Sequence, residues 1–332
     1  MKKIFVTGCT GYIGSHTCVE LLENGYEVIG LDNFSNSKPD ILDKIKIITG
    51  KKIKFYEGNM LDEILLNKIF NENEIDAVID FAAYKSVGDS VNIPIEYYTN
   101  NVSSVLILLS VMKDYGIKNF IFSSSATVYG DAKVMPITEE TPNPYGTSKL
   151  FCENILSDLY KSDSNWNICI FRYFNPVGAH KSHLIGEEPN GIPANLMPFI
   201  SKVATKELEY LSIFGNDYNT PDGTGVRDYI HIVDLAKAHI KGLEKLEHDK
   251  KGMHIYNLGT GKGVSVLEMV EAFEKANNVK INYKIVGRRP GDIAICYADS
   301  KKAEKELNWK AELGLEDMCY DAYMFTKKNN NK

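Results

Sequence analysis

The chain has 332 residues, of which 44% are hydrophobic and 25% charged, and its formal net charge at pH 7 is −6. This composition is typical of an ordinary globular protein and excludes a disordered or collagen-like chain. The acidic balance argues against a nucleic-acid partner. The six scattered cysteines form no CxxC pair and are expected to be free thiols in a reducing compartment. Without a signal peptide or a membrane span in the sequence, we expect a cytoplasmic protein with no membrane partner.

Short apolar runs alternate with helical patterns over the first 175 residues. We expect strands at 3–7, 26–31, 54–56, 77–80, 119–123 and 167–172, and helices at about 12–24, 94–115 and 144–160. The strand runs do not alternate polar with apolar residues, which is typical of strands buried on both faces. The pattern therefore predicts an α/β fold with a Rossmann-type doubly wound parallel sheet.

The composition changes after residue 177: residues 178–193 are rich in Gly, Pro, His and charged residues. This composition predicts a long connection and a domain boundary. We therefore expect one domain over 1–177 and a smaller, mixed α/β domain over 178–332, with some segments returning to the first. Within the second we expect helices at 195–205, from about 233 and from about 265, a strand near 281, and a closing helix.

A glycine-rich turn follows the first expected strand and opens the first helix. Gly8, Gly11 and Gly14 have GxxGxxG spacing. Such a turn allows a pyrophosphate to approach the backbone, where the N–H groups and dipole of the helix N-terminus stabilise its charge. On its own the spacing also fits plain packing of a helix on a strand.

Asp32 ends the second expected strand, 18 residues after Gly14. A carboxylate at this place accepts hydrogen bonds from the adenosine ribose and repels a 2′-phosphate. Together with the turn, it predicts a dinucleotide site that takes NAD rather than NADP.

Tyr145 and Lys149 lie four residues apart at the start of an expected helix, and so share one face. Lowering the tyrosine pKa from about 10 by roughly 3 units requires about 4 kcal/mol of preferential phenolate stabilisation. A lysine charge beside the tyrosine, together with a nearby nicotinamide cation, is expected to supply this stabilisation, and the phenolate is then a general base near neutral pH. The hydroxyl-rich run SSSAT at 123–127 lies at the end of a strand, where ligands bind in parallel sheets, and is expected to supply a hydroxyl donor. The same Tyr/Lys spacing also occurs by chance, so it indicates a catalytic pair only in combination with the neighbouring motifs.

The ordered set of motifs carries a family resemblance. The turn at 8–14, the pair Asp32–Asn33, the run SSSATVYG at 123–130 and Tyr145 with Lys149 resemble the extended short-chain dehydrogenase/reductase family. The stretches at 172–180, 195–198, 213–218 and 222–231 are similar to those of the UDP-glucose 4-epimerases. This resemblance implies that tightly held NAD serves the interconversion of UDP-glucose and UDP-galactose. Tyr145 would take the proton of the sugar 4-hydroxyl while the nicotinamide takes the hydride from C4. Return of this hydride to the other face of the sugar would invert C4.

The resemblance also implies the site residues, with Tyr145, Lys149 and Ser125 as the catalytic set. The residues expected to bind the cofactor are Gly8, Gly11, Tyr12, Ile13, Gly14, Asp32, Asn33, Phe34, Ser35, Asn36, Ser37, Asn59, Met60, Phe81, Ala82, Ala83, Lys85, Asn100, Ser125, Tyr145, Lys149 and Phe174. Those expected to face the nucleotide sugar are Lys85, Ser125, Thr127, Tyr145, Tyr173, Asn175, Asn195, Leu196, Phe214, Arg227, Arg289, Asp292 and Cys296. No metal site is expected.

Three of the residues expected to face the nucleotide sugar have side chains that suit UDP. Arg227 and Arg289 would neutralise a diphosphate, and Phe214 would lie against uracil. Asn59 stands where the family commonly has Asp; because an amide both donates and accepts hydrogen bonds, we expect NAD binding to survive.

Cys296 is the departure that bears on substrate choice. Bacterial epimerases restricted to unmodified hexoses usually have a tyrosine here, and a small residue resembles members that also accept UDP-N-acetylhexosamines. Replacing a phenol ring by a thiol leaves room for an acetamide. The alternative is a small buried cysteine that its neighbours compensate.

Three other functions are alternatives to this one. A nucleotide-sugar 4,6-dehydratase usually has Asp-Glu after the strand-end serine or threonine, where this chain has Ala126–Thr127. A dehydrogenase of the same family would release NADH in each cycle, and a non-catalytic NAD-binding regulator would not need Tyr145. The apolar residues of the helices at 94–115 and 144–160 would form a homodimer contact, as the family suggests, or pack on the sheet.

Overall fold

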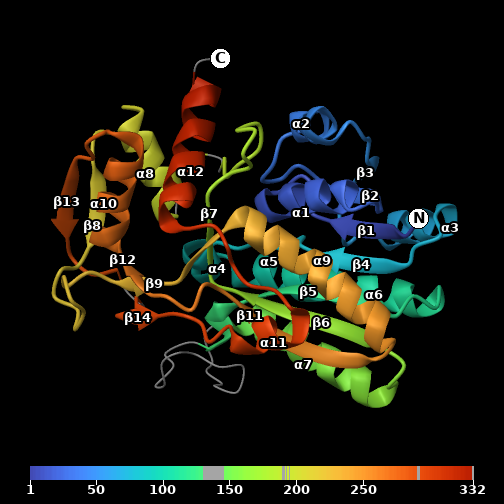
Figure 1. Ribbon diagram of the computed structural model, residues 1–332. Coiled ribbons are helices and arrows are strands. Elements are labelled where there is room, and N and C mark those ends of the chain that lie inside the picture. Colours follow the sequence, from blue (N-terminus) through green and yellow to red (C-terminus); the bar gives the residue numbers. More distant parts are fainter. Residues whose placement is uncertain (130–145, 189–190, 192, 194, 290–291, 331–332) are drawn as a thin grey trace. The chain divides into compact units, whose positions relative to one another are not determined.

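The computed structural model describes residues 1–129, 146–188, 191, 193, 195–289 and 292–330. The chain divides into two compact units, which Figure 1 shows coloured along the sequence. Of the described residues, the first unit comprises 1–129, 146–172 and 236–256, and the second comprises 173–235 and 257–330. The first unit therefore includes the segment 236–256, which lies well beyond residue 177 in the sequence.

The first unit is built on a seven-stranded sheet. Its strands are β1 (Lys3–Thr7), β2 (Glu27–Asp32), β3 (Lys54–Glu57), β4 (Ala77–Asp80), β5 (Asn119–Ser125), β6 (Asn167–Tyr173) and β11 (Gly252–Leu258), in the order β11-β6-β5-β4-β1-β2-β3. The pairs β1–β2, β1–β4, β2–β3 and β4–β5 are parallel. An order of 3-2-1-4-5-6 is that of dinucleotide-binding sheets, so the predicted Rossmann-type class is confirmed.

Helices cover both faces of this sheet (Figure 1). On one face, α3 (Glu63–Glu72), α6 (Ser104–Asp114) and α7 (Thr147–Ser162) share a core with the strand residues Phe5, Val78 and Phe120. The other face carries α1 (Tyr12–Glu23), α2 (Asp40–Thr49) and the part of α9 (Ile232–Asp249) that belongs to the first unit. A Cβ added to Gly242 of α9 would lie 2.6 Å from the ring of Phe171, which shows how closely this helix approaches β6.

The segment expected as one helix over 94–115 is helical but changes its winding. After α4 (Val87–Asn92), it consists of α5 (Pro94–Tyr98), the π-helical turn η1 (Thr99–Ser103) and α6. The side chain of Asn101, buried in η1, accepts from the backbone N–H of Tyr84 at 2.8 Å and donates to its carbonyl at 3.0 Å. A π turn inserts an extra residue in a helix and is frequent at functional sites. Here it ties the helix to the segment that follows β4.

The second unit is a mixed α/β arrangement, as predicted. Its small sheets pair β7 (Asn175–Val177) with β10 (Tyr229–His231), place β9 (Val226–Arg227) between β12 (Val264–Ser265) and β14 (Ile295–Cys296), and pair β8 (Leu211–Phe214) with β13 (Tyr283–Val286). Its helices are α8 (Leu196–Ala204), α10 (Val266–Asn277), α11 (Lys301–Leu307) and α12 (Leu315–Asn330). Met197, Ile213, Phe273 and Met318 belong to one core that joins α8, β8, α10 and α12.

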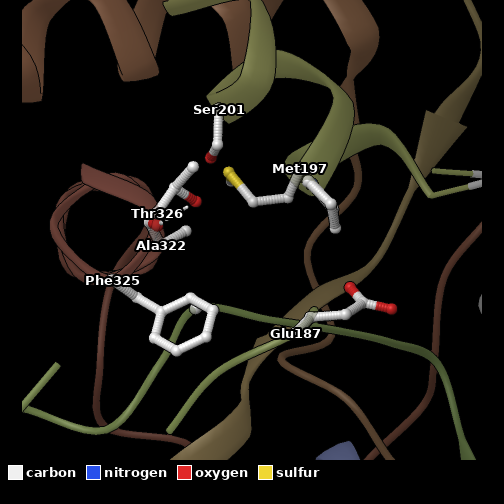
Figure 2. Close-up of a pocket in the computed structure, with 8 residues that line it drawn as sticks. Glu187, Met197, Ser201, Ala322, Phe325 and Thr326 are labelled. Carbon is white, nitrogen blue, oxygen red and sulfur yellow. Dashed lines mark hydrogen bonds between the residues drawn. The ribbon is translucent and has the colours of Figure 1, made fainter. Parts of the chain in front are cut away.

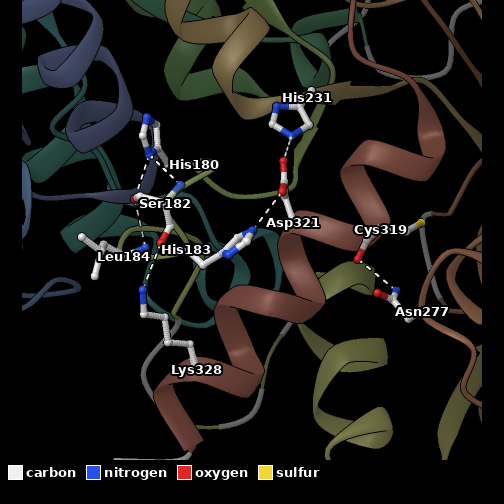
Figure 3. Close-up of polar contacts among 9 residues, drawn as sticks. All are labelled: His180, Ser182, His183, Leu184, His231, Asn277, Cys319, Asp321 and Lys328. Carbon is white, nitrogen blue, oxygen red and sulfur yellow. Dashed lines mark hydrogen bonds and ion pairs between the residues drawn. The ribbon is translucent and has the colours of Figure 1, made fainter. Parts of the chain in front are cut away.

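Two contacts fix α12 within the second unit. The carboxylate of Asp321 lies 3.2 Å from the Nε2 atoms of both His231 and His183 (Figure 3). Figure 2 shows a small cavity between α12 and α8, lined by Gly178, Glu187, Met197, Pro198, Ser201, Ala322, Phe325 and Thr326. None of the predicted site residues lines this cavity, so it contributes to packing rather than to the site.

Candidate active site

The glycine-rich turn joins β1 to α1 as the sequence predicts. Gly11 caps the helix, and its N–H donates to the carbonyl of Gly8 at 3.1 Å. Gly8 has a φ of +61°, and a Cβ added to Gly14 would lie 2.1 Å from the Gly8 oxygen. The turn is therefore too tight for a side chain at position 14. Tyr12, Ile13 and Gly14 form the first helical turn, whose N–H groups point out of the helix N-terminus, where an anion binds favourably.

Asp32, at the end of β2, lies beside this turn. Its Oδ2 accepts from the N–H of Thr10 at 3.0 Å, and its Oδ1 accepts from the N–H of Phe34 at 2.9 Å and from the hydroxyl of Ser37 at 3.2 Å. The carboxylate thus joins the turn to the segment 33–37, in which Asn33, Ser35 and Asn36 are exposed. The structure brings together the two features that predicted a dinucleotide site.

The remaining predicted cofactor residues of the first unit follow the ends of its strands. Asn59 and Met60 follow β3; Phe81, Ala82, Ala83 and Lys85 follow β4; Ser125 ends β5; and Asn100 lies in η1. Ligands of such sheets bind at the carboxyl ends of the strands, so this placement fits a shared site. Met60, however, is 6% exposed and belongs to the core beneath β3, so its side chain serves packing.

Lys149 is held at the end of β5 by two contacts. Its Nζ donates to the carbonyl of Ser123 at 2.7 Å and lies 4.7 Å from the centre of the Phe122 ring. Burial lowers the pKa of Lys149, while the charges of Asp80 and Glu153 oppose this shift.

The hydroxyl of Ser125 lies at the same strand end. It accepts hydrogen bonds from the N–H and the hydroxyl of Thr127, at 3.2 and 3.0 Å, within the short helix η2 (Ala126–Tyr129). Tyr145 lies outside the described residues. The described part of the predicted catalytic set is therefore one fixed ammonium and one strand-end hydroxyl.

Sequence reasoning missed two polar groups near Lys149. Asp80 ends β4 with its carboxylate 2.5 Å from the hydroxyl of Thr7, and both side chains are buried. Glu153, also buried, pairs with Arg172 through Nε at 3.0 Å and Nη2 at 2.6 Å. The signal for Asp80 was present, because a charged residue that ends a buried parallel strand points to a site. Glu153 shows no comparable signal, because nothing in a helix pattern pairs it with a residue of β6.

In the second unit, five predicted substrate residues form one cluster. Nη2 of Arg227 lies 3.3 Å from Oδ1 of Asp292, and Cys296 is the strand partner of Arg227 between β14 and β9. The N–H of Asp292 donates to the carbonyl of Arg289 at 3.2 Å, and the Arg289 guanidinium lies 4.6 Å from the centre of the Phe214 ring. Two guanidinium groups beside a ring that is 39% exposed suit a phosphorylated ligand with an aromatic base.

The other predicted substrate residues of this unit lie elsewhere in it. Asn195 caps α8, and its side chain donates to Glu187 at 2.6 Å, with the partly buried Leu196 next in the helix. Asn175 is exposed on β7, and its N–H donates to the carbonyl of Asp228 at 2.9 Å. Tyr173 and Phe174 are buried, at 7% and 5% exposure. Phe174 was predicted to bind the cofactor, and it belongs to the second unit.

Comparison with known proteins identifies relatives over the whole chain. A family model described as GDP-mannose 4,6 dehydratase matches residues 5–322. UDP-glucose 4-epimerase of Haemophilus influenzae is 60% identical over 331 residues, covering 98% of each chain. The crystal structure of UDP-glucose 4-epimerase from Bifidobacterium longum in complex with NAD+ and UDP is 56% identical with a TM-score of 0.95, covering 99% of each chain. The UDP-Glc/GlcNAc 4-epimerase of Campylobacter jejuni is 32% identical with a TM-score of 0.85, covering 99% of this chain and all of the other. The chain thus belongs to the extended short-chain dehydrogenase/reductase family and, within it, to the UDP-glucose 4-epimerases.

Proposed function

We propose that the protein interconverts UDP-glucose and UDP-galactose by transient oxidation of sugar C4, with NAD as the resident cofactor. The observation that carries this proposal is the fixed ammonium of Lys149 at the end of β5, next to Ser125 and on the sheet that also bears the glycine turn. Relatives that share 60% and 56% of their residues with this chain have the same activity in their names.

The residues around the glycine turn fit NAD. The N-terminus of α1 suits a pyrophosphate, and Asp32 is held beside it by the N–H of Thr10, where it can accept hydrogen bonds from ribose hydroxyls. The same carboxylate would repel a 2′-phosphate, which favours NAD over NADP. We assign cofactor binding to the first unit and nucleotide-sugar binding chiefly to the second.

The chain's own groups divide the work of the reaction. The charge of Lys149 favours the phenolate of Tyr145, which takes the proton of the 4-hydroxyl and later returns it. The hydroxyl of Ser125 donates to the oxygen of the 4-keto sugar. When bound, NAD supplies the hydride acceptor for C4 and the hydride that is returned.

The nucleotide would be held by different groups from the sugar. Arg227 and Arg289 grip the diphosphate and Phe214 lies against uracil, so that the sugar itself is free to turn between the two hydride transfers. The contacts that bind UDP are then the same whichever face of the sugar is turned toward the cofactor.

A dehydratase would need an acid and a base to eliminate water, and the residues after Ser125 provide neither. Ala126 and Thr127 occupy the positions in η2 where a dehydratase has its carboxylic acids. These residues therefore favour epimerisation over dehydration, although the family model that matches the chain is described as a dehydratase.

Incubating the purified protein with UDP-galactose, without added cofactor, tests the proposal. We expect UDP-glucose as the product, bound NAD after denaturation, and retention of a C4 deuterium label in the product. Tyr145→Phe and Lys149→Met should each lower kcat by at least about 100-fold. The control Lys161→Met removes a lysine that lies on the exposed end of α7 beside Asp158 and should keep full activity. Loss of the C4 label to solvent would contradict the proposal.

We further propose that the enzyme accepts UDP-N-acetylhexosamines. Cys296 lies beside Arg227 in the second unit, and its small side chain leaves room for an acetamide. Burial raises the pKa of its thiol to about 11, so the thiol is neutral and presents no charge to the sugar. We expect conversion of UDP-GalNAc to UDP-GlcNAc, and Cys296→Tyr should abolish this activity while sparing UDP-galactose. Activity on the hexose pair alone in the wild-type protein would refute this part.

We also propose a homodimer formed through the helices of the first unit. Ile95, Tyr98, Leu106 and Phe151 are 76%, 41%, 48% and 46% exposed on α5, α6 and α7, and the rings of Tyr98 and Phe151 lie 6.0 Å apart. A two-fold axis would cover this surface with its own copy. Phe151→Glu should halve the mass in light scattering. The control Ile64→Glu, which changes an 85% exposed residue of α3, should leave the mass unchanged.

The six cysteines are free, and five of them are buried, which suits a reducing compartment and supports our proposal of a cytoplasmic enzyme. The net charge of −6 supports the absence of a nucleic-acid partner. In the described part of the chain, no helix has the length and apolar character needed to span a membrane.

A further inference from the structure

Asp80 and Lys149 approach the same face of the sheet in the first unit. Asp80 ends β4, and its strand partner on β5 is Phe122, so both side chains point to one face. The Nζ of Lys149 lies 4.7 Å from the centre of the Phe122 ring and donates to the carbonyl of Ser123. The ammonium therefore stands on the face of the sheet to which the Asp80 side chain points, beside the strand that neighbours β4.

Thr7 fixes the Asp80 carboxylate. Thr7 is the strand partner of Asp80 on β1, and its hydroxyl donates to Oδ1 of Asp80 at 2.5 Å. The same hydroxyl oxygen accepts from the N–H groups of Phe81 and Ala82, both at 3.1 Å. These bonds link the carboxylate to the backbone of two residues that we assign to the cofactor site.

The other charged and titratable groups near Lys149 have partners of their own or are neutral. Glu153 also faces it from α7, but it is paired in a two-pronged bond with Arg172. Burial raises the pKa of the Cys152 thiol to about 11, which keeps it neutral. Burial raises the pKa of Asp80 and lowers that of Lys149, and each charge opposes the shift of the other. Of the two carboxylates in the described part of the chain whose charges act on Lys149, Asp80 is therefore the one that compensates its charge.

We propose that Asp80 is a positioning residue for the epimerisation: anchored by Thr7, its carboxylate balances the buried ammonium of Lys149 and couples it to the segment after β4. This inference rests on the proposed function only for the role of Lys149. Without the carboxylate, the ammonium would lose its proton at lower pH, and the phenolate of Tyr145 would lose its supporting charge.

The test uses Asp80→Asn, which removes the charge but keeps an oxygen that accepts from Thr7. The control is Asp76→Asn, because Asp76 is an exposed aspartate just before β4, at the end of the strand opposite to Asp80. The pKa of Lys149 is measured by NMR on protein labelled with [ε-13C]lysine, with its resonance assigned from Lys149→Met. The pH dependence of kcat/KM for UDP-galactose is measured on the same proteins.

In Asp80→Asn we expect the pKa of Lys149 to fall by about 1 unit and the alkaline limb of kcat/KM to move down with it. In Asp76→Asn we expect neither change. An unchanged Lys149 pKa in Asp80→Asn, or an equal fall in Asp76→Asn, would overturn the proposal. The NMR result does not depend on turnover, so a wild-type protein that fails to convert UDP-galactose would refute the proposed function alone.

If Asp80→Asn is folded but too unstable for the NMR titration, the thermal unfolding of a double variant tests the proposal. An ammonium left without its carboxylate destabilises the fold, so removing it as well should restore stability. We therefore expect Asp80→Asn combined with Lys149→Met to unfold at a higher temperature than Asp80→Asn alone. A double variant as unstable as the single one, or more so, would overturn the proposal.

Discussion

Replacing Gly14 by alanine has opposite expected effects on the free energy of unfolding, depending on whether helix propensity or the tight glycine turn dominates. Gly14 lies in the first turn of α1, and propensity alone predicts that alanine stabilises such a position by about 1 kcal/mol. The structure predicts the opposite sign. An added Cβ would lie 2.1 Å from the Gly8 oxygen and 2.9 Å from the Gly8 carbon, so the backbone of the turn must open by more than about 1 Å to restore an ordinary contact.

Overpacking of this kind costs about 1–3 kcal/mol, and more where the obstacle is backbone, so we expect Gly14→Ala to lose about 3 kcal/mol. Two neighbouring glycines provide a graded comparison. Gly8→Ala puts a side chain at φ +61° with its Cβ 3.0 Å from the N of Ala82, for about 1–2 kcal/mol. Gly11→Ala has an ordinary φ of −65° and a nearest contact of 3.2 Å, for less than about 1 kcal/mol.

Equilibrium unfolding in urea, followed by circular dichroism, ranks the three variants. The NAD retained after purification gives a second readout, because an opened turn no longer presents its N–H groups to a pyrophosphate. We expect stability and bound NAD to fall in the order Gly11→Ala, Gly8→Ala, Gly14→Ala. A Gly14→Ala protein as stable as the wild type would refute the reasoning.

Three further outcomes follow from other parts of the structure. Asp32→Asn should weaken NAD binding about 10- to 100-fold in calorimetry and narrow the preference over NADP, because a charged acceptor for ribose is lost. Arg172→Met should cost about 3–5 kcal/mol in urea unfolding by leaving Glu153 buried and unpaired, and adding Glu153→Leu should recover most of it. Burial lowers the pKa of His180 to about 4, so the folded state resists its protonation; stability is full above about pH 6.5 and falls by up to about 3 kcal/mol toward pH 4. His180→Asn should flatten that slope, and a slope equal to that of the wild type would contradict the assignment.

Local patterns predicted the sheet well because its strands are short, buried and apolar. The expected strands at 3–7 and 77–80 match β1 and β4 residue for residue. The change of winding at η1 could not be predicted in this way. It accompanies the hydrogen bonds between Asn101 and the backbone of Tyr84, which lies 17 residues away and outside any helical repeat.

The same distinction applies to the candidate site. Gly14 and Asp32 were predictable because a strand, a turn and a helix are consecutive in the chain. The contacts of Arg227 with Asp292 and of Arg289 with Phe214 join residues more than 60 positions apart, so no local pattern predicts them; the family resemblance only assigned the four residues to the same substrate site. The place of Asp80 at the end of a buried parallel strand could have pointed to a site, but a single carboxylate carries no spacing from which its partner Lys149 could be deduced.

The position of β11 constrains the order in which a ribosome can release this protein into its native form. β6 ends at residue 173, and its outer neighbour β11 begins at residue 252, so about 80 residues are translated between them. At roughly 5–20 residues per second, β6 remains an open edge for several seconds while the rest of its sheet is already out of the tunnel. A nascent chain paused in this window exposes an unpaired apolar strand, which makes it a substrate for chaperones and for mispairing with a neighbouring nascent chain on the same messenger.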